Sequence, residues 1–232
     1  MRMLTEYQAH VPRVERFNPV ARITHWGHTV TFLLCLFTGL VLFLNSSADW
    51  LAAIFGGYSI AGLIHRISAV ILTLFIIYFI LFNFKGIINW VKDIFRFGKN
   101  DIVFLMKFPF EFLGFPVKIP PQTRFNGGEK MNSVVTPTMV ILLILSGYIM
   151  WFPHLFSAGL VRLAYPTHSI AMVLSTVMVC MHGYLGSFHP GSGESFWGMW
   201  KGTVRTDWAK HHHAIWYEET YGDKKDDKKS EK

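Results

Sequence analysis

Four long apolar stretches without charge divide this chain. No Asp, Glu, Lys or Arg occurs between Arg22 and Asp49, Arg66 and Lys85, Lys130 and Arg162, or Arg162 and Glu194. A hydrocarbon core of about 30 Å needs about 20 residues of helix. The pattern therefore predicts an all-α fold, an integral membrane four-helix bundle with spans at about 23–44, 59–84, 132–152 and 167–188. No small-residue cleavage site follows the first span, which predicts a retained helix rather than a signal peptide.

The basic residues predict the orientation of the bundle. All of the 22 Lys and Arg residues except Arg66 and Arg162 precede the first span, lie between the second and third, or follow the fourth. By the positive-inside rule, both termini and the middle loop are cytoplasmic, in a multi-pass protein of the cell inner (cytoplasmic) membrane. The net charge of +7 then follows from topology and calls for no nucleic acid partner.

The remaining segments carry weaker patterns. Apolar residues at helical spacing over 87–96, interleaved with Lys92 and Arg96, predict an interfacial amphipathic segment in the middle loop. Prolines are expected to break regular structure after it, at Pro109, Pro116, Pro120 and Pro121. Residues 1–221 are predicted to form one domain, and the charged, low-complexity tail 222–232 is predicted to be disordered.

Four histidines fall in or beside the apolar spans: His25, His65, His168 and His182. Fourteen residues separate His168 from His182, a helical rise of about 21 Å with a turn that returns to within about 40° of the same face. From the predicted helix directions, His65 and His168 lie near the outer surface, and His25 and His182 near the cytoplasmic one. The four residues thus form two pairs, each joining two helices at one depth.

Two depth-matched pairs predict two haem b groups, each held by two axial histidines. A single intramembrane histidine is more often a hydrogen bonder between packed helices, but polar groups in the bilayer are costly and usually mark function. His28, one turn from His25, is an alternative ligand for the inner haem. Gly39 and Gly147 could leave room for a flat macrocycle, or could serve helix packing alone.

Other polar residues remain open between two interpretations. Arg22 and Arg66 could neutralise haem propionates or extend to the membrane interface. Cys35 and Cys180 form no CxxC motif and are interpreted as small residues in helix interfaces. The triplet His211–His213 lies among aromatic and apolar residues, which favours an interfacial segment.

Several stretches resemble the cytochrome b (gamma) subunit of membrane-bound formate dehydrogenases, in a wider group with hydrogenase and thiosulfate-reductase cytochromes b. The resemblance covers most of 16–218. It rests on the His168/His182 spacing and on Arg22-Ile23-Thr24-His25-Trp26, Ile64-His65-Arg66, Arg124-Phe125-Asn126-Gly127-Gly128-Glu129-Lys130-Met131 and the stretch 208–217.

The resemblance implies that His65 and His168 ligate an outer haem, and that His25 and His182 ligate an inner one. It also implies a quinone site, of menaquinone type, formed by Asn126, Gly128, Glu129 and His182. Glu129 stands where the family usually has Gln, and His28 is likewise unusual there. A carboxylate at that position could relay protons to a quinone, or could be a solvated loop residue.

The implied function is that of a membrane anchor and electron-transfer subunit without a primary substrate site. Its implied partners are membrane lipid, an iron–sulphur subunit on the outer face and a catalytic subunit with molybdenum or tungsten. A hydrogenase cytochrome b, with a nickel–iron partner, is a close alternative. A metal or proton transporter is a more distant one, because it would need acidic residues in the spans, and these contain none.

Overall fold

The structure is a computed structural model that describes residues 11–222. The segment 222–232, predicted to be disordered, lies outside the described residues except for Gly222, which belongs to the helical turn 218–222. The chain divides into two compact units. The first, here the bundle unit, comprises Asn18–Phe84 and Thr136–Met181. The second, here the charged unit, comprises the described residues of Met1–Phe17, Lys85–Val135 and His182–Lys232.

Within residues 11–222, four helices are long and apolar enough to cross a membrane, as predicted. They are α2 (Pro19–Leu44), α4 (Tyr58–Phe82), α7 (Gly127–Trp151) and α8 (Ala158–Ser187). A 3₁₀ turn η1 (Asn45–Ala48) and α3 (Asp49–Ile54) follow α2, and η2 (Pro153–Leu155) lies between α7 and α8. The all-α fold class is confirmed, whereas the sidedness of the termini stays a prediction.

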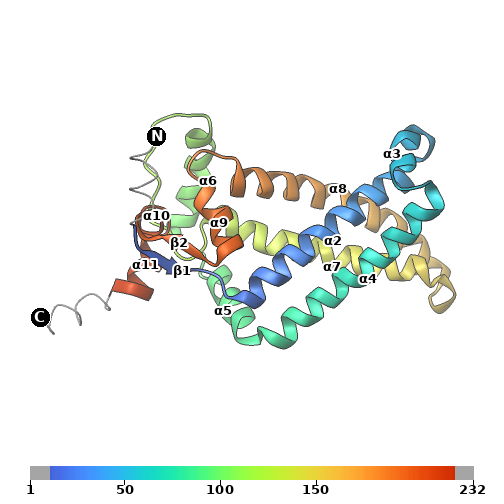
Figure 1. Ribbon diagram of the computed structural model, residues 1–232, viewed down its shortest axis with the longest axis horizontal. Coiled ribbons are helices and arrows are strands. Elements are labelled where there is room, and N and C mark those ends of the chain that lie inside the picture. Colours follow the sequence, from blue (N-terminus) through green and yellow to red (C-terminus); the bar gives the residue numbers. More distant parts are fainter. Residues whose placement is uncertain (1–10, 223–232) are drawn as a thin grey trace, which may run out of the picture. The chain divides into compact units, whose positions relative to one another are not determined.

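The bundle unit is built on α2 and α4, which run side by side (Figure 1). Helix α2 begins with Pro19 after an N-cap, where Asn18 Oδ1 accepts a hydrogen bond from the Ala21 amide at 2.8 Å. Its buried side chains Phe32 and Leu36 pack with Leu72 of α4 and Val140 of α7. This buried cluster fixes the faces that the helices present to each other.

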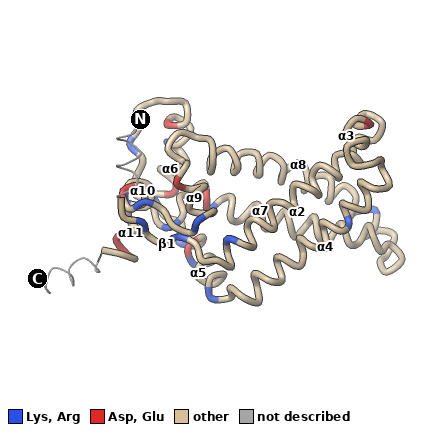
Figure 2. Tube along the Cα trace, in the orientation of Figure 1, with Lys and Arg blue, Asp and Glu red and all other residues tan. Residues whose placement is uncertain are grey.

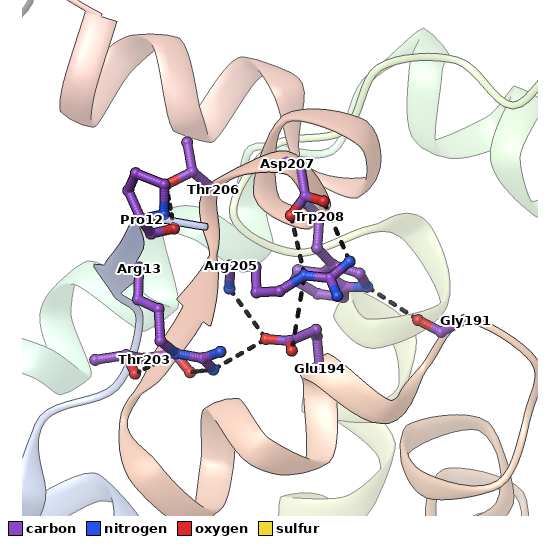
Figure 3. Close-up of polar contacts among 9 residues, drawn as sticks. All are labelled: Pro12, Arg13, Gly191, Glu194, Thr203, Arg205, Thr206, Asp207 and Trp208. Atoms are coloured by element: carbon purple, nitrogen blue, oxygen red, sulfur yellow. Dashed lines mark hydrogen bonds and ion pairs between the residues drawn. The ribbon is translucent and has the colours of Figure 1, made fainter. Parts of the chain in front are cut away.

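The charged unit contains short helices and a small sheet. Strands β1 (Arg13–Glu15) and β2 (Thr203–Arg205) pair antiparallel, with Val14 opposite Val204. Glu194 forms ion pairs with Arg13 at 3.0 Å and Arg205 at 4.0 Å (Figure 3). The helices are α5 (Phe84–Phe95), α6 (Lys99–Phe112), α9 (Gly193–Lys201), α10 (Thr206–His212) and α11 (Ala214–Tyr217), followed by the π-helical turn η3 (Glu218–Gly222).

Charge is distributed unequally between the two units. Figure 2 shows Lys, Arg, Asp and Glu gathered on the elements of the charged unit, while the long helices carry few of them. The core of the charged unit is nevertheless apolar, with Val204, Trp208, Ala209, Trp216 and Tyr217 buried. Segments next to the N-terminus and near the C-terminus therefore fold together into one core.

Two local expectations need correction. Helix α6 continues through Pro109 to Phe112, so this proline does not end the helix. The segment from Gly127 to Met131 forms the first turns of α7 rather than a loop, so Glu129 is no loop residue. The triplet His211–His213 is divided, because the His213 ring is buried and packs against Trp208 and Trp216 while His211 and His212 are exposed; its interfacial position stays a prediction.

Candidate functional site

The structure brings His65 of α4 and His168 of α8 together inside the bundle unit. Their ring centres are 6.3 Å apart and their planes are inclined at 65°. Two imidazoles that ligate one metal ion from opposite sides hold their ring centres about 6 Å apart, since each metal–nitrogen bond is about 2 Å. The observed spacing matches that requirement.

The Nδ1 atom of His65 is held by helix α2. It lies 3.0 Å from the carbonyl oxygen of Cys35 and 3.1 Å from Oγ1 of Thr38. A carbonyl oxygen only accepts hydrogen bonds, so Nδ1 carries the proton and donates. The lone pair of the imidazole is therefore on Nε2, the form in which histidine ligates a metal.

The Nδ1 atom of His168 is held in the same way by helix α7. It lies 3.0 Å from Oγ of Ser146, which in turn lies 3.3 Å from the carbonyl oxygen of Leu143, as Oγ1 of Thr38 does from that of Cys35. Cys35 and Leu143 each stand three residues before the hydroxyl-bearing residue. Both histidines thus have an equivalent set of neighbours on two different helices.

Glycine follows the hydroxyl residue in both places. A Cβ added at Gly39 would lie 3.3 Å from Cε1 of His65, and one added at Gly147 would lie 3.4 Å from Cε1 of His168. Contacts this short would require the histidine ring to shift if a side chain were added. The two glycines let α2 and α7 approach the histidine rings directly, and their predicted role beside a macrocycle stays a prediction.

These observations fit a haem held by His65 and His168. The two rings have the spacing of axial ligands, both Nδ1 atoms are oriented by hydrogen bonds, and glycines flank both rings. Such second-shell hydrogen bonds orient a ligating histidine and select its tautomer. No group of three or more His, Cys, Asp or Glu residues within 11–222 could hold a bare metal ion.

The second predicted pair is divided between the units. His25 lies half-buried on α2 in the bundle unit, with the Trp26 ring edge-on at 5.1 Å. His182 lies on α8 in the charged unit. His28 stacks on Phe32 at 6.0 Å. The pairing of His25 with His182, and the alternative His28, stay predictions.

Two further predicted residues have defined contacts within the bundle unit. Nε of Arg66 donates to the carbonyl oxygen of Gly62 at 3.1 Å, and its guanidinium lies over the Trp151 ring at 5.8 Å. The Cys35 thiol lies 3.7 Å from the carbonyl oxygen of His65, in agreement with a helix-interface role.

Asn126 and Glu129 form a reciprocal cap at the start of α7. Asn126 Oδ1 accepts from the Glu129 amide at 2.9 Å, and Glu129 Oε2 accepts from the Asn126 amide at 2.8 Å. This is a capping box, which satisfies two amides that a helix start leaves unpaired. Gly128 lies inside the cap, since a Cβ there would be 3.3 Å from Asn126 Oδ1.

The remaining carboxylate oxygen of Glu129 faces a buried arginine. Oε1 lies 3.7 Å from Nη2 of Arg16, whose side chain is only 2% exposed. The same Nη2 donates to the Arg124 carbonyl oxygen at 3.0 Å and to Nε2 of His213 at 3.0 Å. Burial lowers the pKa of Arg16 to about 10, although Glu129 acts in the opposite direction.

His213 is kept neutral next to that arginine. Its Nδ1 donates to the carbonyl oxygen of Thr123 at 2.9 Å, which leaves Nε2 to accept from Arg16. Burial, followed by the positive charge of Arg16, lowers the pKa of His213 well below its usual value. Glu129 is thus anchored in a buried polar network rather than being an isolated surface carboxylate.

Four residues that support the site were not among those expected from the sequence. Thr38 and Ser146 orient the two histidines, while Arg16 and His213 support Glu129. One signal was visible in the sequence, because both Thr38-Gly39 and Ser146-Gly147 place a small hydroxyl residue directly before a glycine in an apolar span. Nothing in the sequence indicated that Arg16 contacts His213 across 197 positions.

Comparison with known proteins gives a consistent result. Residues 16–202 match the family model described as prokaryotic cytochrome b561. The formate dehydrogenase cytochrome b556 subunit of Haemophilus influenzae is 30% identical over 210 residues, which cover 89% of this chain and 83% of that protein. The formate dehydrogenase cytochrome b556(fdo) subunit of Escherichia coli K12 is also 30% identical, over 89% of this chain and 92% of its own length.

A second Escherichia coli K12 protein, the nitrate-inducible formate dehydrogenase cytochrome b556(Fdn) subunit, is 26% identical over 89% of this chain and 91% of its length. These matches span almost the whole chain, including all four apolar helices. Such a match implies haem b and an electron-transfer role in the membrane. The chain belongs to the prokaryotic cytochrome b561 family, among the cytochrome b subunits of formate dehydrogenases.

Proposed function

We propose that this protein is the membrane-anchoring dihaem subunit of a formate dehydrogenase type complex. It passes electrons from an iron–sulphur partner on the outer face to a quinone near the cytoplasmic face. The observation that carries this proposal is the His65–His168 pair, with its ring spacing of 6.3 Å and its oriented Nδ1 atoms. Haem b supplies reversible one-electron transfer when bound.

In this proposal the chain positions the haems and forms their surroundings. His65 and His168 offer Nε2 from two different helices, and the backbone at Gly39 and Gly147 leaves the ring faces uncrowded. The second haem takes His25 and His182. His182 shares helix α8 with His168, so one continuous helix contributes a ligand to each haem. The 14-residue separation supports two haems stacked along that helix, about 21 Å apart.

The quinone site is proposed at the start of α7, with Asn126, Gly128, Glu129 and His182. The capping box uses Oδ1 of Asn126 but leaves its amide nitrogen available to donate to a quinone carbonyl oxygen. Glu129 keeps one carboxylate oxygen outside the cap, near Arg16. That carboxylate is 35% exposed, so it is able to exchange protons with the solvent.

The relatives support partners of the formate dehydrogenase type. They are described as cytochrome subunits of formate dehydrogenase. We therefore propose that this chain assembles with an iron–sulphur subunit and with a catalytic subunit that contains molybdenum or tungsten. Co-purification of a nickel–iron subunit instead would support the hydrogenase alternative. The quinone is proposed to be menaquinone.

The haem assignment is tested by histidine substitutions in membranes that contain the full chain. His168→Ala and His65→Ala should each remove about half of the b-type absorbance in a reduced-minus-oxidised spectrum, because each variant loses one axial ligand of the same haem. His154→Ala, in the turn η2, is the matched control and should keep the full haem content. Full haem content in both His65→Ala and His168→Ala would refute the assignment.

The quinone assignment is tested separately. Asn126→Ala should leave the haem spectrum unchanged and slow the oxidation of reduced haem by a menaquinone analogue, because the donor to the quinone is lost. Asn126→Asp keeps an acceptor for the cap but lacks the amide donor, and should be equally slow. Loss of haem with unchanged quinone reduction would contradict the proposed quinone site.

A further inference from the structure

The hydroxyls of Thr38 and Ser146 make the same unusual pair of contacts. Oγ1 of Thr38 donates to the Leu34 carbonyl oxygen at 2.6 Å and lies 3.1 Å from Nδ1 of His65. Oγ of Ser146 donates to the Leu142 carbonyl oxygen and lies 3.0 Å from Nδ1 of His168. In both cases the first acceptor is four residues earlier on the same helix.

The direction of the contact to each histidine follows from counting protons. A hydroxyl has one proton, and both hydroxyls give it to the carbonyl oxygen four residues back. Each hydroxyl oxygen can therefore only accept from Nδ1–H of its histidine. Both side chains are buried, Thr38 at 0% and Ser146 at 3% exposure, so water does not compete for these hydrogen bonds.

The backbone contact alone is common in these helices. Thr31 and Thr176, for example, donate to the carbonyl oxygens of Gly27 and Met172, four residues earlier. Such bonds satisfy a hydroxyl in an apolar span and need no functional explanation. Thr38 and Ser146 differ because each also contacts a ring nitrogen, and because the two histidines they contact face each other.

We infer that Thr38 and Ser146 are positioning residues that hold His65 and His168 in the Nε2-ligating tautomer and lower the reduction potential of the haem between them. The inference rests on the proposed function, in which these histidines are axial ligands. A hydrogen bond accepted from Nδ1–H makes the imidazole a stronger electron donor. A stronger donor favours ferric over ferrous iron. The two hydroxyls would therefore make this haem easier to oxidise than it would be without them.

His65 and His168 have equivalent neighbours, so both contribute to the effect on the reduction potential. Nδ1–H of His65 is shared between Oγ1 of Thr38 and the carbonyl oxygen of Cys35, and that of His168 is donated to Oγ of Ser146, so neither ring can turn without losing these hydrogen bonds. The backbone of the glycine after each hydroxyl lies close to Cε1 of the histidine. The ring inclination of 65° is therefore set by the two helices α2 and α7 rather than by the histidines alone.

The test uses Thr38→Val, Ser146→Ala and the double variant, in membranes with the full chain. Each removes a hydroxyl with little change of shape. Haem content should stay at the wild-type level, while redox titration of the b-type absorbance should show one component shifted to higher potential. The double variant should shift further. The low-spin ferric signal of the same component should change in electron paramagnetic resonance, because the rings lose part of their restraint.

The control is Thr176→Val, which removes the same backbone contact from a threonine that has no contact to His65 or His168. It should leave both potentials unchanged, and Thr38→Ser should restore the wild-type potential because it keeps the hydroxyl. Unchanged potentials in Thr38→Val and Ser146→Ala with haem retained would overturn the inference while leaving the haem assignment intact. Loss of haem from both Thr38→Val and Thr38→Ser would also overturn it, since the methyl group would then be the essential part.

Discussion

In the bundle unit, the half-buried imidazoles of His65 and His168 are hydrogen-bonded by hydroxyls of neighbouring helices and, for His65, by a backbone carbonyl. In the charged unit, the buried ammonium group of Lys130 lies 2.8 Å from the Asp101 carboxylate and also donates to the Arg96 carbonyl oxygen at 2.7 Å. The parts of the four long helices that belong to the bundle unit contain no carboxylate that could pair with a cation, so neutral groups must satisfy each other there. The two histidines are therefore held by neutral hydrogen bonds, whereas the charged unit contains a buried pair of opposite charges.

The strongest test of the comparison is to leave one of these charges unpaired. Lys130→Ala removes the cation from a pair in which both side chains are at most 6% exposed. We expect the charged unit to lose about 3–5 kcal/mol, because a buried carboxylate without a partner is strongly destabilising. Thermal unfolding and limited proteolysis in detergent would measure the loss.

Two further variants make the Lys130 result specific. Lys92→Ala, at an exposed position on α5, should change stability by less than about 0.5 kcal/mol. The double variant Lys130→Met with Asp101→Leu removes both charges and should recover most of the stability. If the double variant were as unstable as Lys130→Ala, the cost would come from packing and not from the unpaired charge.

The corresponding test in the bundle unit changes shape instead of charge. Gly39→Val places a branched side chain where even a Cβ would lie 3.3 Å from His65. Overpacking of this kind costs about 1–3 kcal/mol, and here it should also displace the His65 ring and halve the haem content. Gly62→Ala, where the nearest atom to the new Cβ is 3.9 Å away, is the control. Full haem content in Gly39→Val would contradict the close approach of α2 to the His65 ring.

The stability of the charged unit should also depend on pH, through His213. The folded-state pKa of His213 lies well below 6.5 because the ring is buried, next to Arg16. Above pH 6.5 the residue is neutral in both the folded and unfolded states, and its full contribution to stability is present. As the pH falls below about 6.5, only the unfolded state takes up the proton, which costs the charged unit about 1.4 kcal/mol per pH unit.

The acid response is measured by unfolding the protein between pH 7.5 and about 5, which lies on both sides of the unfolded pKa. His213→Gln should flatten the pH dependence of the charged unit, since it has no proton to gain. His154→Gln, at an exposed position, should not change it. An unaltered slope in His213→Gln would show that other groups cause the acid sensitivity.

The smallest expected effect concerns Glu129. Gln at this position keeps the capping box but loses the charge opposite Arg16. Because the Glu129 side chain is 35% exposed, Glu129→Gln should change stability by less than about 1 kcal/mol. Glu129→Ala also loses the cap and should be less stable by about 1 kcal/mol more. Equal stabilities of the two variants would show that the cap contributes nothing.

The helices were predictable because their causes are local. Uncharged windows of sufficient length give the four spans, with α2 and α4 within four residues of their predicted ends. The start of α8 was placed nine residues late, at 167 instead of Ala158. Pro166 lies inside this helix, where a proline removes a backbone hydrogen bond and is disfavoured, so local preference does not predict that the helix continues through it.

The candidate site was predictable only in its ligands. His65 and His168 stand out as polar residues in apolar spans, and helical geometry relates their depths. Thr38 and Ser146 do not stand out, because a hydroxyl in a span is commonly satisfied by its own backbone. Their contact with a histidine depends on how α2 meets α4 and how α7 meets α8.

The four apolar spans could be read from the sequence alone, and the same reading predicts that four histidines act as two pairs, of which the structure brings His65 and His168 together. Both inferences depend on the cost of charge in hydrocarbon and on the fixed rise and turn of a helix, which act within one segment. Which hydroxyl orients which histidine, and that Arg16 meets Glu129 and His213, became visible only in the folded chain. Those contacts join residues far apart in the chain, so they follow from how the elements pack and from no local pattern.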